Sequence, residues 1–266
     1  MQLPKSTEHS FLHRQRSRGA LKTGLNARGL ARHREEGCLK LRLPQGGSEA
    51  IVINTSGGLA GGDFLTTDIS VEAGAEFILT SQSAERVYGT LGPSAEVSHH
   101  FQVANGAALA WLPQETIMFD GAALHRKMLV ELAQGATFLA VEALVLGRTA
   151  SNENVRQIVL SDHWDIWQGG KLIHAERIGL CGVPPNSAAT LGANKAFATV
   201  IVISDNVESL KGKLTQIESP GLGISCWNGK LIARLIAEDG FLLRKTLKAV
   251  VSACLKGKAL PRVWDM

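Results

Sequence analysis

The chain has 266 residues, of which 45% are hydrophobic and 20% charged, a composition with room for one large globular domain. It contains no apolar run of the roughly 18 residues that a membrane-spanning helix needs. Its four cysteines form no CxxC pair of the kind that binds zinc, and scattered cysteines are typical of the reducing cytoplasm. Twenty-eight glycines beside eight prolines favour many tight turns between short strands.

The positive charge is concentrated at the start of the chain. Residues 1–42 hold ten Lys or Arg and three Glu, whereas the remaining 224 residues hold 18 basic and 21 acidic side chains. Such a segment can attract nucleic acid, a membrane surface or an acidic protein. Because its basic residues alternate with apolar ones around 20–22 and 39–43, and lack aromatic neighbours for base stacking, the pattern favours solvated strands, with neither nucleic acid nor membrane as a partner.

An internal repeat marks the middle of the chain. The pentapeptides VEAGA at 71–75, VANGA at 103–107 and LAQGA at 132–136 each lie between two β-prone runs, and glycine at the fourth position supplies the positive φ of a tight turn. Recurrence at roughly 30 residues is typical of stacked supersecondary units, each of which buries its apolar face against the next. The sequence therefore predicts a mainly β fold, a layered, β-helix-like stack of antiparallel and mixed strands.

Two α-helices are predicted in the C-terminal half. One begins with Asp205 as its N-cap and runs to about residue 217, and the other is capped by Asp239 and runs to about residue 256, with apolar side chains at helical spacing in both. Between them, Asn-Gly at 228–229 joins two β-prone runs, which is a strong hairpin signal. Further strands are expected at 172–180 and 198–203. Since no stretch has the composition of a linker, residues 1–266 are predicted to form a single domain.

The densest glycine cluster lies just before Asp63 and contains Gly57, Gly58, Gly61 and Gly62. It lacks the Gly-Lys-Ser/Thr of a phosphate loop, and the residues after it alternate as a strand instead of opening a helix. We interpret the cluster as a turn in which two backbones approach closely. Asp63 is expected either to cap this turn or to act as an oxygen ligand or a charged wall of a passage.

Other carboxylates interrupt apolar segments. Glu115 and Asp120 lie in the stretch WLPQETIMFDGA, and Glu142 interrupts the nearly continuous apolar stretch VEALVLG. Burial of a carboxylate is costly unless it is paired or faces water. Together with Arg86 and Arg148, these acids are expected to form either a structural ion network or a polar channel.

A strong metal site is not indicated. His99 and His100 are adjacent, so in a strand their rings point to opposite faces and cannot easily share an ion. The sequence has neither an HExxH motif nor the nucleophile elbow of a hydrolase. Carboxylates suit hard ions, whereas strong transition-metal sites favour His or Cys, so a transition metal is expected to be held weakly.

Several segments, in order along the chain, resemble one family. The stretches INTSGGLAGGD at 53–63, LTSQSAERVY at 79–88, WLPQETIMFDG at 111–121 and LGR at 146–148 resemble signatures of the urease accessory protein D family, also called H in some organisms, and the stretches at 227–231 and 260–264 fit as well. The resemblance extends from about residue 14 to residue 264. Ala60, Arg86 and Gly89 depart from residues that are common in the family, and these departures concern packing and rim charge.

The resemblance implies a urease maturation factor that is not itself an enzyme. It implies a cytoplasmic complex with the accessory proteins F and G, of which G is the GTPase, docked on the urease apoprotein, and a water-filled passage for nickel. No tightly bound cofactor is implied, only a transient nickel ion. The residues expected to line or shape the passage are Asp63, Glu115, Asp120, Glu142 and Arg148, with Asp63 and Glu142 as weak nickel ligands. The supporting motif residues are Gly57, Gly58, Gly61, Gly62, Gln82, Arg86 and Tyr88.

Two other functions remain open. A β-helix-type enzyme could act on a polysaccharide through its carboxylates, but one Tyr and five Trp without a periodic aromatic stripe argue against sugar binding. A purely structural protein-binding module is the second alternative. Co-purification with apo-urease and accessory protein F would distinguish the maturation factor from such a module.

Overall fold

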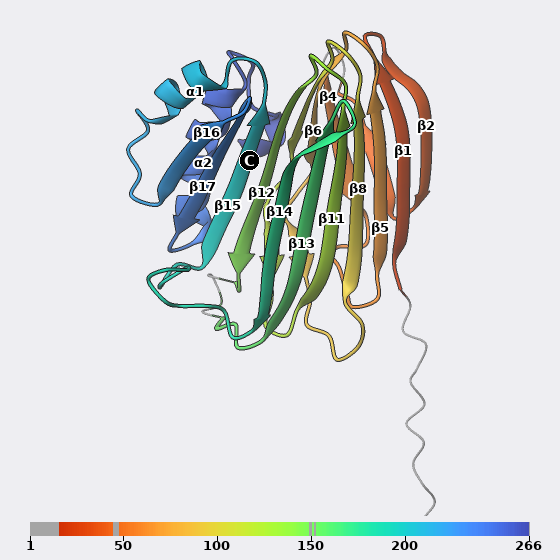
Figure 1. Ribbon diagram of the computed structural model, residues 1–266. Coiled ribbons are helices and arrows are strands. Elements are labelled where there is room, and N and C mark those ends of the chain that lie inside the picture. The colour runs from red at the N-terminus through yellow and green to blue at the C-terminus, as the bar shows by residue number, and fades with distance from the viewer. Residues whose placement is uncertain (1–15, 45–47, 149–150, 152, 266) are drawn as a thin grey trace, which may run out of the picture.

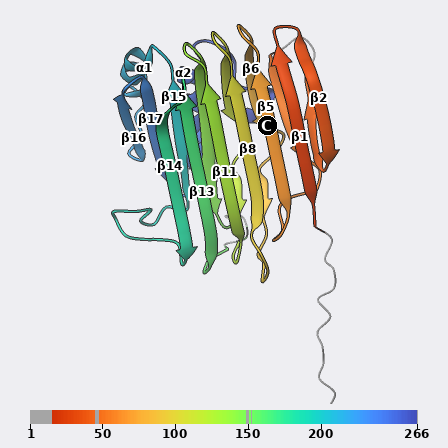
Figure 2. The ribbon, with the colours of Figure 1, turned by 45° about the vertical axis from the view of Figure 1, so that its right-hand side comes forward.

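Two large β-sheets form the body of the protein in the computed structural model, which describes residues 16–44, 48–148, 151 and 153–265 (Figure 1). The first sheet has the order β14-β13-β11-β8-β5-β1-β2, and its strands lie side by side in Figure 2. The second has the order β16-β17-β15-β12-β9-β6-β4-β3. The first sheet comprises β1 (Arg18–Asn26), β2 (Gly29–Gly37), β5 (Phe64–Val71), β8 (Ala95–Val103), β11 (Ala123–Leu132), β13 (Ile158–Gln168) and β14 (Lys171–Gly182). The second comprises β3 (Leu39–Arg42), β4 (Glu49–Asn54), β6 (Glu76–Ser81), β9 (Ala108–Leu112), β12 (Thr137–Leu146), β15 (Ala196–Ile203), β16 (Leu222–Trp227) and β17 (Lys230–Ala237).

The centre of the molecule is a stack of coils. The chain alternates between the sheets, from β5 to β6, from β8 to β9 and from β11 to β12, and the strands of successive coils pair in parallel within each sheet. Two short strands, β7 (Glu85–Val87) and β10 (Thr116–Met118), also belong to the second sheet, outside the order given above. They pair in parallel with each other, and β10 pairs in parallel with the end of β12. The predicted β-helix-like stack is confirmed.

The repeated pentapeptides are the turns that carry the chain from the first sheet to the second. Gly74, Gly106 and Gly135 have φ values of 71°, 65° and 73°, the left-handed conformation that glycine adopts without steric cost. Each turn also bonds to the one below it, since Ala104 N donates to Val71 O at 3.0 Å. The stacking of these turns explains why the motif recurs.

Two hydrophobic cores lie on opposite faces of the second sheet. Alternate residues of β12, such as Phe138 and Leu144, pack between the sheets, while Val141 and Val145 pack beneath the helices. A strand that is buried on both faces has no polar alternation, which accounts for the continuous apolar run in this segment. Glu142 belongs to the face that looks into the space between the sheets, because it follows the alternation of Ala140 and Leu144.

The helices α1 (Val207–Leu214) and α2 (Gly240–Cys254) cover the outer face of the second sheet. Asp239 accepts a hydrogen bond from Leu242 N at 2.8 Å, which confirms the predicted cap of α2. The predicted cap of α1 was wrong: Asn206 occupies the position, without a side-chain bond, because three residues after β15 are needed to turn the chain onto the sheet. The hairpin β16–β17 turns at Asn228 and Gly229 as predicted.

The early part of the chain forms three strands, β1, β2 and β3, where the sequence pattern indicated two, around 20–22 and 39–43. β1 pairs in parallel with β5 and antiparallel with β2, so these two strands of the basic segment extend the first sheet and leave β2 as a mostly exposed edge strand. The last strand of the segment, β3, pairs with β4 in the second sheet. Charged side chains on an edge strand hinder unwanted pairing with other chains. Within the described residues, no helix has the length and apolar character to cross a membrane.

Candidate functional site

A cavity of about 160 Å³ lies between the sheets beside β7 and β10. Four residues of the predicted motif set border it: Gly57, Gly58, Gln82 and Arg86. Of the five predicted passage residues, Glu142 borders it as well. Its other polar lining includes Glu85, His99 and Arg126. The cavity therefore gathers residues from segments that are up to 103 positions apart in the chain, from Leu39 to Glu142.

A buried ion cluster forms one wall of the cavity. Arg126 contacts Glu142 Oε2 through Nη1 at 2.6 Å and Asp162 through two nitrogens at 3.1 and 2.7 Å. The exposed fractions of Glu142, Arg126 and Asp162 are 3%, 5% and 0%. One cation thus lies between two carboxylates, and the cluster carries a surplus of negative charge when both are ionised. Trp111 Nε1 also donates to Glu142 at 3.2 Å.

The burial of this cluster changes its proton affinities. Burial raises the pKa of Glu142, an effect that the charge of Arg126 opposes and that of Asp162 reinforces. Burial also disfavours a charged guanidinium, yet the two carboxylates raise the pKa of Arg126 above its ordinary value. Arg126 therefore stays charged, and Glu142 takes up a proton more readily than an exposed glutamate does.

Glu85 places a second carboxylate at the cavity. Asn54 Nδ2 donates to both of its oxygens, at 3.2 and 3.1 Å. Burial, reinforced by the nearby charge of Asp63, raises the pKa of Glu85 to about 7, although the Asn54 bonds act in the opposite direction. An incoming cation would therefore favour the ionised form of Glu85.

His99 adds a neutral nitrogen group. Its ring lies 5.0 Å from Trp111 and 5.9 Å from Phe101, measured between centroids, whereas His100 projects to the outer face and contacts Glu131. Burial, with the charge of Arg126, lowers the pKa of His99 to about 3, so the ring is neutral at physiological pH. Its Nδ1 is buried and has no hydrogen-bond partner among the described residues.

A row of polar side chains continues from Glu142 across the second sheet. Glu142 is in register with Thr199, which is in register with Arg234. Arg234 donates to Thr199 Oγ1 at 3.0 Å and to Glu176 Oε2 at 2.6 Å. Beyond it, His174 Nε2 lies 3.7 Å from the same Glu176 oxygen, too far for a hydrogen bond. The row ends at an open hollow of about 430 Å³, which is bordered by His174, Glu176 and Arg234.

Asp63 lies beside the cavity and does not border it. One of its oxygens accepts a hydrogen bond from Ala60 N at 2.8 Å and the other accepts one from Ser17 N at 2.7 Å. Asp63 thus caps the glycine-rich turn and ties it to the start of β1. It still acts on the cavity through its charge, which contributes to the raised pKa of Glu85.

The glycine cluster allows the close approach of two backbone segments that the sequence predicts. Gly58 has a φ of 135°, and a Cβ at this position would lie 2.8 Å from Arg86 O and 2.6 Å from the Tyr88 ring. A Cβ at Gly61 would lie 2.2 Å from Thr90 Oγ1, whereas one at Gly62 would lie 3.0 Å from Arg16 Nε. Tyr88 in turn donates from its hydroxyl to Gly57 O at 2.9 Å. The motif therefore lets the turn close over the backbone of β7.

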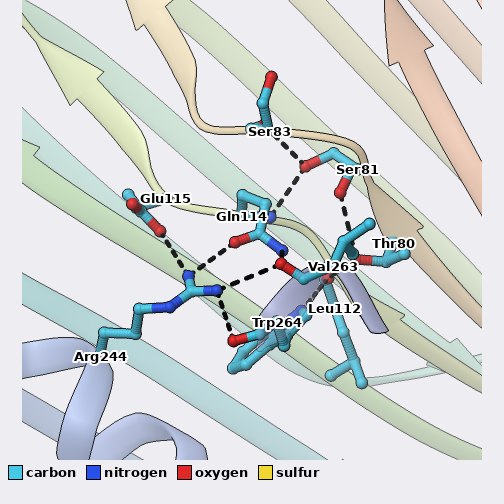
Figure 3. A network of polar contacts seen from close by, with 9 residues as sticks. All are labelled: Thr80, Ser81, Ser83, Leu112, Gln114, Glu115, Arg244, Val263 and Trp264. Carbon is cyan, nitrogen blue, oxygen red and sulfur yellow. Dashed lines mark hydrogen bonds and ion pairs between the residues drawn. The ribbon is translucent and has the colours of Figure 1, made fainter. Parts of the chain in front are cut away.

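Glu115 belongs to a different cluster, on the outer side of the same wall. Arg244 of α2 donates to Glu115 Oε2 at 3.1 Å and to Gln114 Oε1 at 2.6 Å (Figure 3). Gln114 borders the cavity, whereas Glu115 points away from it toward α2. The two adjacent residues thus connect the cavity wall with the helix layer.

Asp120 and Arg148 lie near the end of β10, away from the cavity lining. Asp120 accepts hydrogen bonds from Arg156, including one from its backbone N at 2.7 Å, and these bonds lower the pKa of Asp120 to about 2. Arg148 pairs with Glu153 at 3.0 Å and lies 4.6 Å from the centre of the Phe119 ring. Both residues hold neighbouring loops in place.

Sequence reasoning missed Glu85, Arg126, Asp162 and Glu176. A signal was present for the last three, because each occupies an inward position of an alternating strand, as Arg126 does between Leu124 and Met128. Glu85 belongs to the stretch LTSQSAERVY at 79–88, but the residues next to it in the sequence do not indicate that its carboxylate is buried.

The chemistry that this arrangement offers is weak coordination. Among the described residues, no three His, Cys, Asp or Glu side chains converge as a metal site. The cavity instead presents single carboxylates and one imidazole, and a cation that enters can bind each of these only together with water. Ligand sets of this kind hold a divalent ion loosely.

Comparison with known proteins identifies the family. A family profile described as UreD urease accessory protein matches residues 14–265. A urease accessory protein UreD of Chelativorans sp. (strain BNC1) is 41% identical over 244 residues, covering 89% of this chain and 88% of the relative. The UreD proteins of Rhizobium leguminosarum bv. trifolii (strain WSM2304) and Sinorhizobium medicae (strain WSM419) are 42% and 40% identical, over 87% and 92% of this chain and 88% and 93% of their own lengths. The chain therefore belongs to the urease accessory protein D family, whose members take part in urease maturation.

Proposed function

We propose that this chain is a non-enzymatic scaffold that helps to load nickel into urease. It acts in the cytoplasm, in a complex with accessory proteins F and G on the urease apoprotein, and G supplies GTP hydrolysis. Nickel is the cargo and binds only transiently. The proposal is supported by the family membership and by the polar cavity, and a single observation carries it: a carboxylate, Glu142, that is almost fully buried and yet borders a cavity.

The protonation of the cavity supports a route for a cation. The pKa of Glu85 is raised to about 7 by burial and by the charge of Asp63, and the pKa of Glu142 is raised by burial and by the charge of Asp162, which Arg126 only partly offsets. A divalent cation would supply the missing charge and displace protons. Oxygen ligands release nickel readily, as transfer requires. The row of polar side chains from Glu142 to Glu176 provides a path for the ion across the molecule.

The remaining predicted residues take supporting parts in this proposal. Asp63 fixes the glycine-rich turn and adds negative charge beside Glu85. Glu115 anchors the cavity wall to α2. Asp120 and Arg148 hold the loops beyond β10. Weak nickel binding is assigned to Glu142 at the cavity and to Asp63 at its margin.

Nickel content of urease tests the proposal. Urease is co-expressed with its accessory proteins and with this chain carrying Glu142→Gln, a change that keeps the size of the side chain and leaves Arg126 paired with Asp162. We expect several-fold less nickel per urease active site, while the complex with the accessory proteins still forms. Glu131→Gln, on the outer face of β11, is the matched control. Unchanged nickel content in Glu142→Gln would remove this cavity from the route.

A further inference from the structure

Arg244 joins three parts of the chain that are distant in sequence (Figure 3). Its guanidinium donates to Gln114 Oε1 at 2.6 Å and to Glu115 Oε2 at 3.1 Å, both in the segment between β9 and β10. It also donates to the backbone oxygen of Trp264 at 2.8 Å, in the short 3-10 helix η2 (Arg262–Trp264). Charged hydrogen bonds of this kind are among the stronger contacts in proteins.

The segment that Arg244 holds has no regular secondary structure of its own. Residues 113–115 lie between β9 and β10 outside either strand. Gln114 N donates to Ser81 Oγ at 2.8 Å, and Gln114 Nε2 donates to Val263 O at 3.3 Å. On the other side of η2, Trp264 Nε1 donates to Leu112 O at 3.1 Å. Hydrogen bonds that involve side chains therefore hold Gln114 in position.

The same segment carries part of the cavity. Pro113 and Gln114 border it directly. Glu115 O accepts a hydrogen bond from the backbone N of Glu85 at 2.9 Å, so the segment also holds the residue that places a carboxylate at the cavity. A continuous series of contacts thus leads from Arg244 on the helix layer, through Gln114 and Glu115, to Glu85.

We propose that Arg244 is a positioning residue that, through Gln114 and Glu115, fixes the cavity wall and the backbone of Glu85. Docking of α2 and η2 then determines the width of the cavity and the direction of the Glu85 carboxylate. The assignment of nickel as the ion that this wall serves rests on the proposed function, whereas the positioning itself does not.

Amide hydrogen exchange tests the positioning without nickel. In Arg244→Met, the amides of Gln114 and Glu85 should exchange about tenfold faster or more. The hydrogen bonds of Arg244 are then absent, so local opening of the segment costs less free energy. The amide of Ala104, in a turn at the far end of the coils, should be unchanged. Lys248→Met is the matched control: Lys248 lies one turn further along α2 and pairs with Asp265 at 2.6 Å without contact to Gln114.

Two further variants keep the test decisive. Gln114→Leu removes the hydrogen bond that Arg244 donates to the Gln114 side chain, and the Glu85 amide should again exchange faster. This variant provides the test if Arg244→Met unfolds the protein. Arg244→Lys, which can still donate to one oxygen, should restore part of the protection. Wild-type exchange at Gln114 and Glu85 in both Arg244→Met and Gln114→Leu would overturn the proposal.

Nickel loading separates this proposal from the proposed function. If both hold, Arg244→Met lowers nickel per urease active site several-fold, and Arg244→Lys recovers part of it, with the protein complex intact. If exchange is faster but nickel content is unchanged in both Arg244→Met and Glu142→Gln, the positioning stands and the nickel route through this cavity fails.

Discussion

At the scale of single residues, the unusual feature is charge at inward positions of a stacked β structure. Arg126, Asp162 and Glu142 occupy inward positions in strands whose neighbours on the same face are Leu, Met, Ala and Trp. Removal of one partner from a buried ion pair leaves an uncompensated charge, which costs far more than the loss of an exposed pair. The cluster is therefore sensitive to substitution in a way that surface pairs are not.

Arg126→Met should destabilise the protein by about 3–5 kcal/mol, because it leaves Asp162 and Glu142 buried without their cation. Urea unfolding at neutral pH measures the change. Arg156→Met, which removes the 82% exposed partner of Asp120, should leave stability nearly unchanged. Equal losses in the two variants would contradict a buried, charged cluster.

Glu85→Gln should change stability in a pH-dependent way. The pKa of Glu85 is raised from 4.5 to about 7, so the folded protein binds a proton that the unfolded chain releases, and this stability is lost as pH rises from 4.5 through 7. Glutamine cannot ionise, and its amide oxygen can still accept one hydrogen bond from Asn54. The variant should thus gain stability relative to wild type at pH 8, by at most about 3 kcal/mol, and little at pH 4.5. The same difference in unfolding free energy at both pH values would rule out a raised pKa.

At the scale of elements, the repeated turns define the coils. Each places a glycine with positive φ at the same point, directly before the strand that enters the second sheet. Glycine is needed at these positions for its backbone conformation and not for lack of space, since a Cβ at Gly74 or Gly106 would meet no atom within 4 Å. Substitution at these positions therefore isolates the conformational cost.

Gly106→Ala should destabilise the protein by about 1–2 kcal/mol, which is the cost of a left-handed conformation in a residue with a Cβ. Gly223→Ala is the matched control, because it also has open space around it but no positive φ, and it should be neutral or stabilising by up to about 1 kcal/mol. Thermal unfolding of both variants gives the comparison. A neutral effect of Gly106→Ala would show that the turn tolerates another conformation.

At the scale of the whole molecule, the second sheet separates two environments. Its outer face, under α1 and α2, is an apolar core, whereas its inner face carries the polar side chains Glu142, Thr199 and Arg234, which reach Glu176 on β14 of the first sheet. The cavity of about 160 Å³ and the hollow of about 430 Å³ lie at the two ends of this row. If nickel follows the row, substitutions at both ends should have the same consequence.

Glu176→Gln should lower nickel per urease active site, as Glu142→Gln should, while binding to the accessory proteins is retained. The physical reason is that Glu176 supplies the carboxylate at the far end of the row, where Arg234 and His174 lie against it. Asp165→Asn, an exposed carboxylate on β13 that pairs with Arg177, is the control and should load urease normally. A loss of nickel in Glu142→Gln alone would indicate a route that does not follow the row.

The sequence by itself determined the repeated turns, the hairpin at Asn228, the cap at Asp239 and the family, because each depends on residues that are close together in the chain. Only the tertiary structure decided which polar groups meet. Arg126 reaches Asp162 36 residues away, and Arg244 reaches Gln114 at a separation of 130. Such contacts depend on how strands stack and in which register they pair, and a shift of one residue would turn each side chain to the opposite face.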